Sequence, residues 1–281
     1  MKVSGFTIVK NAIKYNYPVK EAILSILPMC DEFIVNVGDS EDCTLDVINS
    51  IQSPKIKIFG RKWDFNKGST ELADQTNFAL SKCSGDWAFY IQSDEVVHEK
   101  DLKVLEKVML KYSNDNSVEA IRFRYLHFYN SFYRYRIDRG WYQKEDRIIK
   151  NNGMIKSTKD AKGFVKINGK DIKRIVSPCF IYHYGWVQSE SKMKERQVNA
   201  ANIGFGCFKE TEKNSEYNFH DLDRFPIYFG THPKVMERRV KEDGKSAEDF
   251  RHIKRMHFWN PLLWFRIRYK TFVRNKKSLP K

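Results

Sequence analysis

Residues 87–99 read WAFYIQSDEVVHE, and this stretch decides the fold. Seven mostly apolar residues run directly into two adjacent acids, Asp94 and Glu95. Two neighbouring carboxylates repel each other, and each costs free energy to desolvate unless a positive group lies nearby. A bound cation, or a proton shared at an active site, would account for the pair. The alternative interpretation is a strand that ends at a solvated turn.

Strand and helix patterns alternate through the first 113 residues. Apolar runs that end in polar residues predict strands, and apolar residues at helical spacing predict the helices between them. The strands are expected at 3–9, 31–40, 55–63 and 86–95, and the helices at 18–30, 41–52, 69–84 and 100–113. Strands that alternate with helices of this length indicate βαβ units and a parallel sheet with right-handed crossovers.

Acidic residues follow two of these strands. Asp39 ends the second strand, and Asp94 and Glu95 end the fourth. Open α/β sheets bind ligands beyond the carboxyl ends of their strands. We therefore expect these acids to lie on one rim of the sheet, which favours a functional site over a solvated turn.

The pattern changes after residue 115. Residues 119–143 are aromatic and basic and are typical of strands or a hairpin that line a groove, and 146–171 carry Asn-Gly and Gly turn signals. A further strand is expected at 177–186, followed by a helix at 189–204. We predict an α/β domain over 1–235, with one half at 1–105 and a second half at 106–235. Residues 236–281 are expected to form a basic, aromatic, helical appendage.

Charge is distributed unevenly along the chain. The net charge is +15, but residues 1–100 hold more acids than bases, and Arg251–Lys281 contains no acid at all. A basic tail with interleaved aromatic residues suits an anionic surface, so we expect a membrane interface; the alternative is a helix packed on the domain. No nucleic-acid module is recognisable. The five cysteines include no CxxC pair, and there is no secretory signal or apolar run long enough to span a membrane. These features predict a cytoplasmic protein, or one peripheral to the inner membrane face.

Four motifs in order make the N-terminal half similar to a known family. They are TIVKN (7–11), VNVGDSEDCT (35–44), GSTELADQTNFAL (68–80) and YIQSDE (90–95). This set, at the expected strand ends, resembles the family-2-type nucleotide-sugar glycosyltransferases of the GT-A fold over roughly residues 3–105. The later IYHYGWV (181–187) and FGTHP (229–233) resemble patterns that recur in the same group. The resemblance implies that 1–105 is the nucleotide-sugar-binding half of the domain and 106–235 the acceptor-binding half.

The resemblance implies a divalent metal, Mn²⁺ or Mg²⁺, that neutralises the diphosphate leaving group. Asp94 is the expected ligand, and His183 is either a second ligand or a core histidine. The nucleotide-sugar-binding residues would be Lys10, Asn11, Asp39, Lys67, Gln92, Ser93 and, again, Asp94. The sequence departs from the family pattern at two places. Gln92 occupies the position of the first acid of the D-x-D motif, and the acid that usually follows the second strand is displaced, so that Asp39, Asp42 or neither takes its role.

The resemblance also implies inversion at the anomeric carbon, which needs a general base. The candidates are Glu95, Glu145 and Asp146, and the residues alone do not rank them. The predicted function is transfer of a sugar from a nucleotide-diphosphate donor, most simply a UDP-sugar, to a glycan or lipid-linked acceptor in cell-surface polysaccharide synthesis. The alternative is a non-catalytic protein that binds anionic lipid or nucleic acid through a degenerate transferase domain.

Overall fold

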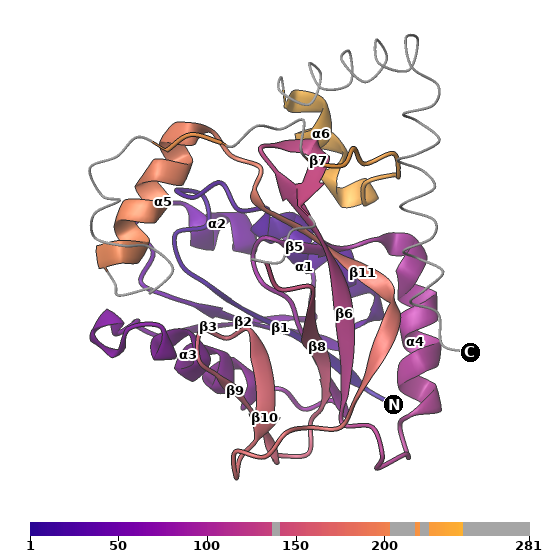
Figure 1. Cartoon of the computed structure of the whole chain (residues 1–281). Helices are drawn as coiled ribbons and strands as arrows, with labels where there is room; N and C mark the ends of the chain where they lie inside the picture. Colours follow the sequence, from indigo (N-terminus) through magenta and orange to yellow (C-terminus); the bar gives the residue numbers. More distant parts are fainter. Residues whose placement is uncertain (137–140, 203–216, 220–224, 244–281) are drawn as a thin grey trace.

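The computed structural model describes residues 1–136, 141–202, 217–219 and 225–243 (Figure 1). The predicted basic stretch Arg251–Lys281 lies outside these residues, so its membrane contact stays a prediction. Within the described part of the chain, no helix is both long enough and apolar enough to cross a bilayer.

A nine-stranded sheet forms the centre of the described structure. Its strands are β1 (Val3–Val9), β2 (Glu32–Val37), β3 (Ile56–Gly60), β4 (Trp87–Tyr90), β5 (Glu95–Val97), β6 (Ala120–Tyr129), β7 (Ser131–Arg136), β8 (Lys144–Lys150) and β11 (Arg174–Trp186). The strand order is β3-β2-β1-β4-β8-β6-β11-β5, and β7 pairs with β6. Strands β1 to β4 are parallel as predicted, whereas β8 enters antiparallel between β4 and β6.

Helices connect the strands, as the alternating pattern predicts. They are α1 (Val19–Ile26), η1 (Leu27–Met29), α2 (Thr44–Asn49), η2 (Phe65–Lys67), α3 (Thr70–Leu80), η3 (Glu99–Asp101), α4 (Leu102–Lys111), α5 (Glu190–Asn202), η6 (Lys234–Met236) and α6 (Glu237–Glu242). A separate hairpin is formed by β9 (Ile155–Thr158) and β10 (Gly163–Lys166).

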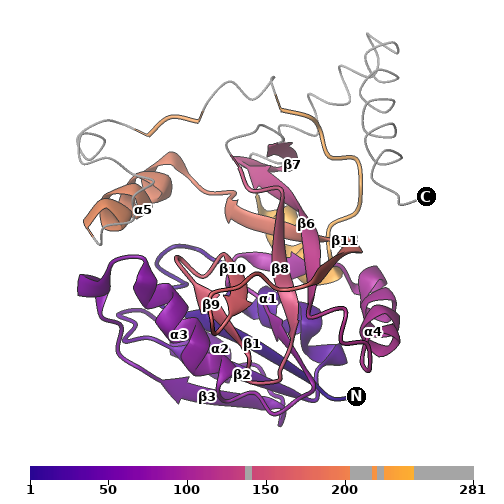
Figure 2. The same cartoon turned by 60° about the horizontal axis from the view of Figure 1, so that its bottom comes forward.

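Both faces of the sheet are covered. Side chains from α1, α2 and α4 pack with one set of strand residues, such as Phe33 and Phe89. Side chains from α3 and the β9–β10 hairpin pack on the other face, against Phe6 and Tyr90 (Figure 2). Every residue of β1 and β2 is buried, which is the expected burial of a parallel sheet covered on both faces.

The fourth strand differs from its prediction. It ends at Tyr90, and Glu95 begins the short strand β5, which pairs antiparallel with β11. Asp94 therefore lies in the connection between β4 and β5, and Glu95 belongs to the sheet interior. The two adjacent acids thus have different surroundings.

The start of the predicted appendage packs on the α/β body. Met236 of η6 is fully buried, and Arg239 of α6 forms an ion pair with Glu21 of α1 at 2.8 Å. The proposed division at residue 236 stays a prediction.

Glu32, at the start of β2, is expected to make stability depend on pH. Its carboxylate accepts hydrogen bonds from Ser4 Oγ (2.7 Å) and Ser84 N (2.6 Å) and pairs with Lys57 Nζ (2.7 Å). Burial alone would raise the pKa of Glu32, but these partners outweigh it and lower the pKa from 4.5 to about 2. The resulting stabilisation is complete above pH 4.5 and is lost as the pH falls towards 2.

We therefore expect Glu32→Gln to lower the free energy of unfolding at pH 7 by about 2 kcal/mol, since Lys57 is half exposed and the solvent screens part of the interaction. Urea unfolding between pH 7 and pH 2 measures this. The variant should lose less stability than the wild type on acidification. Glu41→Gln is the control because the Glu41 side chain is 74% exposed. Equal acid losses in the wild type and Glu32→Gln would contradict the prediction.

Candidate active site

Asp94 lies at the carboxyl edge of the parallel strands. Its backbone carbonyl accepts a hydrogen bond from Tyr184 N at 2.8 Å, which joins the β4–β5 connection to β11. Gly185 follows on β11, and a Cβ atom built there would collide with the Asp94 carboxylate. The absence of a side chain at Gly185 therefore leaves the space that the carboxylate occupies.

His183 of β11 faces Asp94. Its Nε2 lies 3.2 Å from Asp94 Oδ2, and both side chains are largely but not completely buried, at 7% and 14% exposure. Burial alone would raise the pKa of Asp94, but His183 and the charge of Arg196 outweigh it and lower the pKa. Asp94 is thus an ionised carboxylate with an imidazole nitrogen beside it.

This pair of atoms fits a divalent cation. A carboxylate oxygen and an imidazole nitrogen at this separation can bind the same ion: carboxylate oxygens suit Mg²⁺ and Mn²⁺, and imidazole is a ligand of many divalent transition metals. No cluster of three His, Cys, Asp or Glu side chains able to hold a metal exists among the described residues. A cation here would complete its coordination with water and diphosphate oxygens, as Mg²⁺ commonly does.

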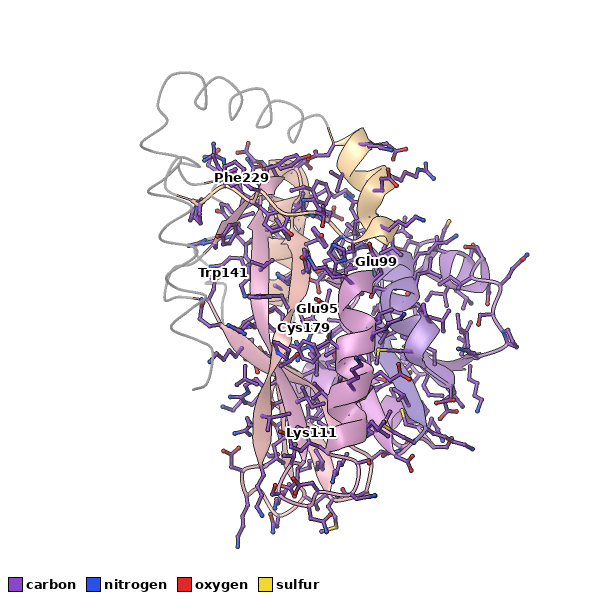
Figure 3. The ribbon with its side chains drawn as sticks, turned by 90° about the vertical axis from the view of Figure 1, so that its right-hand side faces the viewer. Glu95, Glu99, Lys111, Trp141, Cys179 and Phe229 are labelled. Atoms are coloured by element: carbon purple, nitrogen blue, oxygen red, sulfur yellow. The ribbon has the colours of Figure 1, made fainter. Side chains whose placement is uncertain are left out.

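Glu95 has a different environment from Asp94. It is fully buried and binds Arg147 through two hydrogen bonds of 2.7 and 2.8 Å, and it also accepts one from Tyr125 Oη at 2.8 Å. A register shift between β6 and β8 leaves Arg147 as the extra residue of a β-bulge. Figure 3 shows Glu95 inside the molecule. Its observed contacts are those of a structural ion pair; its predicted catalytic role stays untested.

Asp146 also forms ion pairs with arginines. It is fully buried, accepts two hydrogen bonds from Arg122 at 2.7 and 3.0 Å, and lies 3.4 Å from Arg174. These contacts hold β8 to β6 and β11. Its predicted role as a base likewise stays untested.

Glu145 is only partly buried. Burial raises the pKa of Glu145, and Arg147 and Arg122 lower it less than burial raises it. The nearby phenol of Tyr142 has a raised pKa, caused first by burial and then by the charges of Glu95, Asp94 and Glu145, among others. The charges of these three carboxylates thus act on Tyr142. Glu95 pairs with Arg147 and Asp94 with His183, whereas Glu145 forms no ion pair within the part of the chain that the structure describes.

The nucleotide end of the site follows β1 and β2. Lys10 pairs with Asp39 at 2.5 Å, and Trp63 N donates to Asp39 at 3.3 Å. Burial raises the pKa of Asp39, but hydrogen bonds from Lys10 and Trp63 lower it overall. Asp42, the alternative acid, accepts hydrogen bonds from Thr44 N at 3.0 Å and from Lys14 N at 2.7 Å. Of these two aspartates, Asp39 is the more exposed.

The other predicted nucleotide-sugar-binding residues lie at different places in the structure. Asn11 Oδ1 accepts a hydrogen bond from Glu41 N at 2.8 Å and holds the loop after β2. Gln92 Nε2 donates to Ala161 O at 3.3 Å in the β9–β10 turn. Lys67 pairs with Asp74 at 2.8 Å on the exposed side of α3, and Ser93 is partly exposed beside Asp94. Their predicted contacts with a nucleotide sugar stay untested.

Similarity to known proteins identifies the family of this chain. The model of "Glycosyl transferase family 2" matches residues 7–169, which is more than half of the chain. The chain belongs to glycosyl transferase family 2. It is a nucleotide-sugar-dependent glycosyltransferase, and this favours the enzyme over the non-catalytic alternative.

Solved structures similar to this family 2 transferase include TarS residues 1–349 from S. aureus. The two share 17% identity over 76% of this chain and 68% of TarS 1–349, with a TM-score of 0.42. Glucosyl-3-phosphoglycerate synthase from Mycobacterium tuberculosis, in complex with Mg²⁺ and UDP, shares 16% identity over 44% of this chain and 43% of its own, with a TM-score of 0.33. The chain covers 41% of the length of the longer TarS structure from S. aureus. No curated protein sequence matches significantly.

Two residues of this transferase were missed by sequence reasoning. Arg196 of α5 donates to Gly185 O, and its charge acts on Asp94. Trp63 lies beside Asp39 and packs edge-on against Phe65, with ring centroids 5.8 Å apart. No sequence pattern pointed to Arg196, because it lies in a helix without a recognisable motif. Trp63 could have been found as the aromatic residue at the end of the predicted strand 55–63.

Proposed function

We propose that this family 2 transferase moves a sugar from a UDP-sugar to a glycan or lipid-linked acceptor, with a divalent cation held by Asp94 and His183. The observation that carries the proposal is the 3.2 Å approach of Asp94 Oδ2 and His183 Nε2 at the carboxyl edge of the sheet. When bound, Mn²⁺ or Mg²⁺ supplies positive charge to a departing diphosphate.

The donor lies across the ends of β1, β2 and β4 in this proposal. Asp39 accepts a hydrogen bond from the base or ribose, and the Trp63 ring offers an aromatic surface beside it. Arg196 then faces the diphosphate, because its guanidinium already lies near Asp94. Cationic side chains bind phosphate strongly, and arginine does so with two parallel hydrogen bonds.

Glu145 is the general base that the surroundings favour. Glu95 is bound to Arg147, and Asp146 to Arg122 and Arg174, so either would have to break a buried ion pair to accept a proton. Glu145 has a raised pKa, which makes its carboxylate a stronger base. It would take the proton of the acceptor hydroxyl as that oxygen attacks the anomeric carbon with inversion.

The acceptor class rests on the charge of the chain. The net charge of +15 suits an anionic or lipid-linked glycan at a membrane surface. Cell-surface polysaccharide synthesis is the process we propose for it, at the cytoplasmic face of the membrane.

Melting temperatures in the presence of nucleotides test the donor and the metal together. UDP or a UDP-sugar with Mn²⁺, at about 100 times its Kd, is expected to raise Tm by about 5 °C, because binding stabilises only the folded state. GDP and dTDP with Mn²⁺, and UDP with EDTA, are the comparisons. Equal shifts for the three nucleotides would contradict the UDP assignment. No shift with any nucleotide and metal would overturn the proposed site.

A further inference from the structure

A second histidine lies behind His183. His127 of β6 is opposite His183 of β11 in the parallel register, and it is 1% exposed. Its Nδ1 lies 3.0 Å from His183 Nδ1, and its Nε2 lies 2.7 Å from the carbonyl oxygen of Tyr142. The contacts therefore run from Tyr142 through His127 and His183 to Asp94.

The chemistry of each partner determines which nitrogens carry hydrogen. A carbonyl oxygen only accepts, so His127 must donate its Nε2–H to Tyr142. A cation bound at His183 Nε2 needs a lone pair on that nitrogen, so His183 must then carry its proton on Nδ1 and donate it to the Nδ1 lone pair of a neutral His127. Without a cation, the Nε2–H of His183 donates to Asp94 Oδ2 at 3.2 Å. A cation that replaces this proton finds the carboxylate oxygen and the imidazole nitrogen already side by side.

The rings around His127 fix its orientation. Tyr142 and Trp141 pack edge-on against it at centroid distances of 4.7 and 5.0 Å, and Tyr125 stacks on it at 5.2 Å. A ring held on these sides cannot turn to exchange its two nitrogens without disturbing the cluster. The Nδ1 atom of His127, which faces His183, is thus held in place before any ligand binds.

We propose that His127 is a positioning residue, which selects the form of His183 that has a free Nε2 lone pair and so prepares it to bind a divalent cation. The inference rests on the proposed metal site at Asp94 and His183. His127 itself touches neither metal nor substrate. Partners that orient a metal-binding histidine typically contribute about 10–100-fold in metal affinity.

Two substitutions of His127 separate hydrogen bonding from packing. His127→Phe keeps an aromatic ring but removes the acceptor for His183 Nδ1–H. His127→Asn places an amide oxygen near the position of Nδ1 and can still accept. We expect the Phe variant to weaken Mn²⁺ binding in the presence of UDP by about 10–100-fold, and the Asn variant to recover most of it. Mn²⁺ affinity is measured from the free-ion signal in electron paramagnetic resonance.

His98→Phe is the matched control. His98 is another buried histidine, and it contacts Thr231 Oγ1 at 3.0 Å rather than the site. It should leave Mn²⁺ affinity unchanged. Unchanged affinity in a folded His127→Phe protein, or equal losses in the Phe and Asn variants, would overturn the role of His127. If His183→Ala and Asp94→Asn also bind Mn²⁺ like the wild type, the metal site itself is wrong.

Nitrogen-15 spectra of the histidine rings provide a second readout. In the diamagnetic Mg²⁺–UDP complex, His127 should carry its proton on Nε2 and His183 on Nδ1. The His127→Asn protein assigns the His127 signals by their loss. A proton on His127 Nδ1 in this complex would mean that His183 does not donate to it, and would refute the inference independently of the affinities.

Discussion

Asp94→Asn is expected to reduce sugar transfer by on the order of 10³-fold while the protein stays folded, because the amide removes the negative charge that binds the cation. The Asn side chain has nearly the same size, so the contact with Gly185 is kept. Asp94 is also largely buried and has a lowered pKa, which means that the wild type holds it ionised at neutral pH. Turnover of a UDP-sugar with and without acceptor measures the loss.

The loss should be accompanied by weaker Mn²⁺ binding and by an almost unchanged Tm. Asp86→Asn is the matched control, since the Asp86 side chain is 66% exposed and the residue precedes β4, at the opposite end of this strand from Asp94. It should retain wild-type turnover. Turnover of Asp94→Asn equal to that of the wild type would remove the metal site and the proposed mechanism with it.

Glu145→Gln is expected to lower kcat by about 10²–10⁴-fold, the usual contribution of a general base. Because burial raises the pKa of Glu145, the acidic limb of the wild-type pH profile should lie above the ordinary glutamate value of 4.5. The base works only when ionised, so activity falls as the pH drops through this raised pKa. The dependence of kcat/KM on pH measures it, and the Gln variant should lose this limb.

Substitutions of the neighbouring acids Glu95 and Asp146 test whether each carboxylate acts as the base or only stabilises the fold. Glu95→Gln leaves the buried charge of Arg147 without its partner, so it should destabilise the fold by about 3–5 kcal/mol. Asp146→Asn should destabilise it less, because Arg122 and Arg174 are partly exposed and the solvent screens their charges. Their residual activity, measured at a temperature where they stay folded, should keep the acidic limb. If Glu145→Gln turns over like the wild type and a folded Asp146→Asn protein does not, the base is Asp146.

The order of elements could be predicted from the sequence because it depends on local patterns. Apolar runs and helical spacing located the first four strands and the helices between them, and the parallel arrangement followed from their alternation. That arrangement placed Asp39 and Asp94 at the same edge, with only β1 between their strands. The antiparallel entry of β8 was not predicted, since it depends on pairing between segments far apart in the chain.

The sequence by itself determined the class of fold, the family and the edge of the sheet at which the acids gather. Only the tertiary structure decided how similar acids differ. Asp94 faces His183 beside Gly185, whereas Glu95 is enclosed by Arg147 and Tyr125. The physical reason is that a carboxylate's ionisation and availability depend on its burial and on charges brought from distant strands, and neither is encoded in the residues next to it.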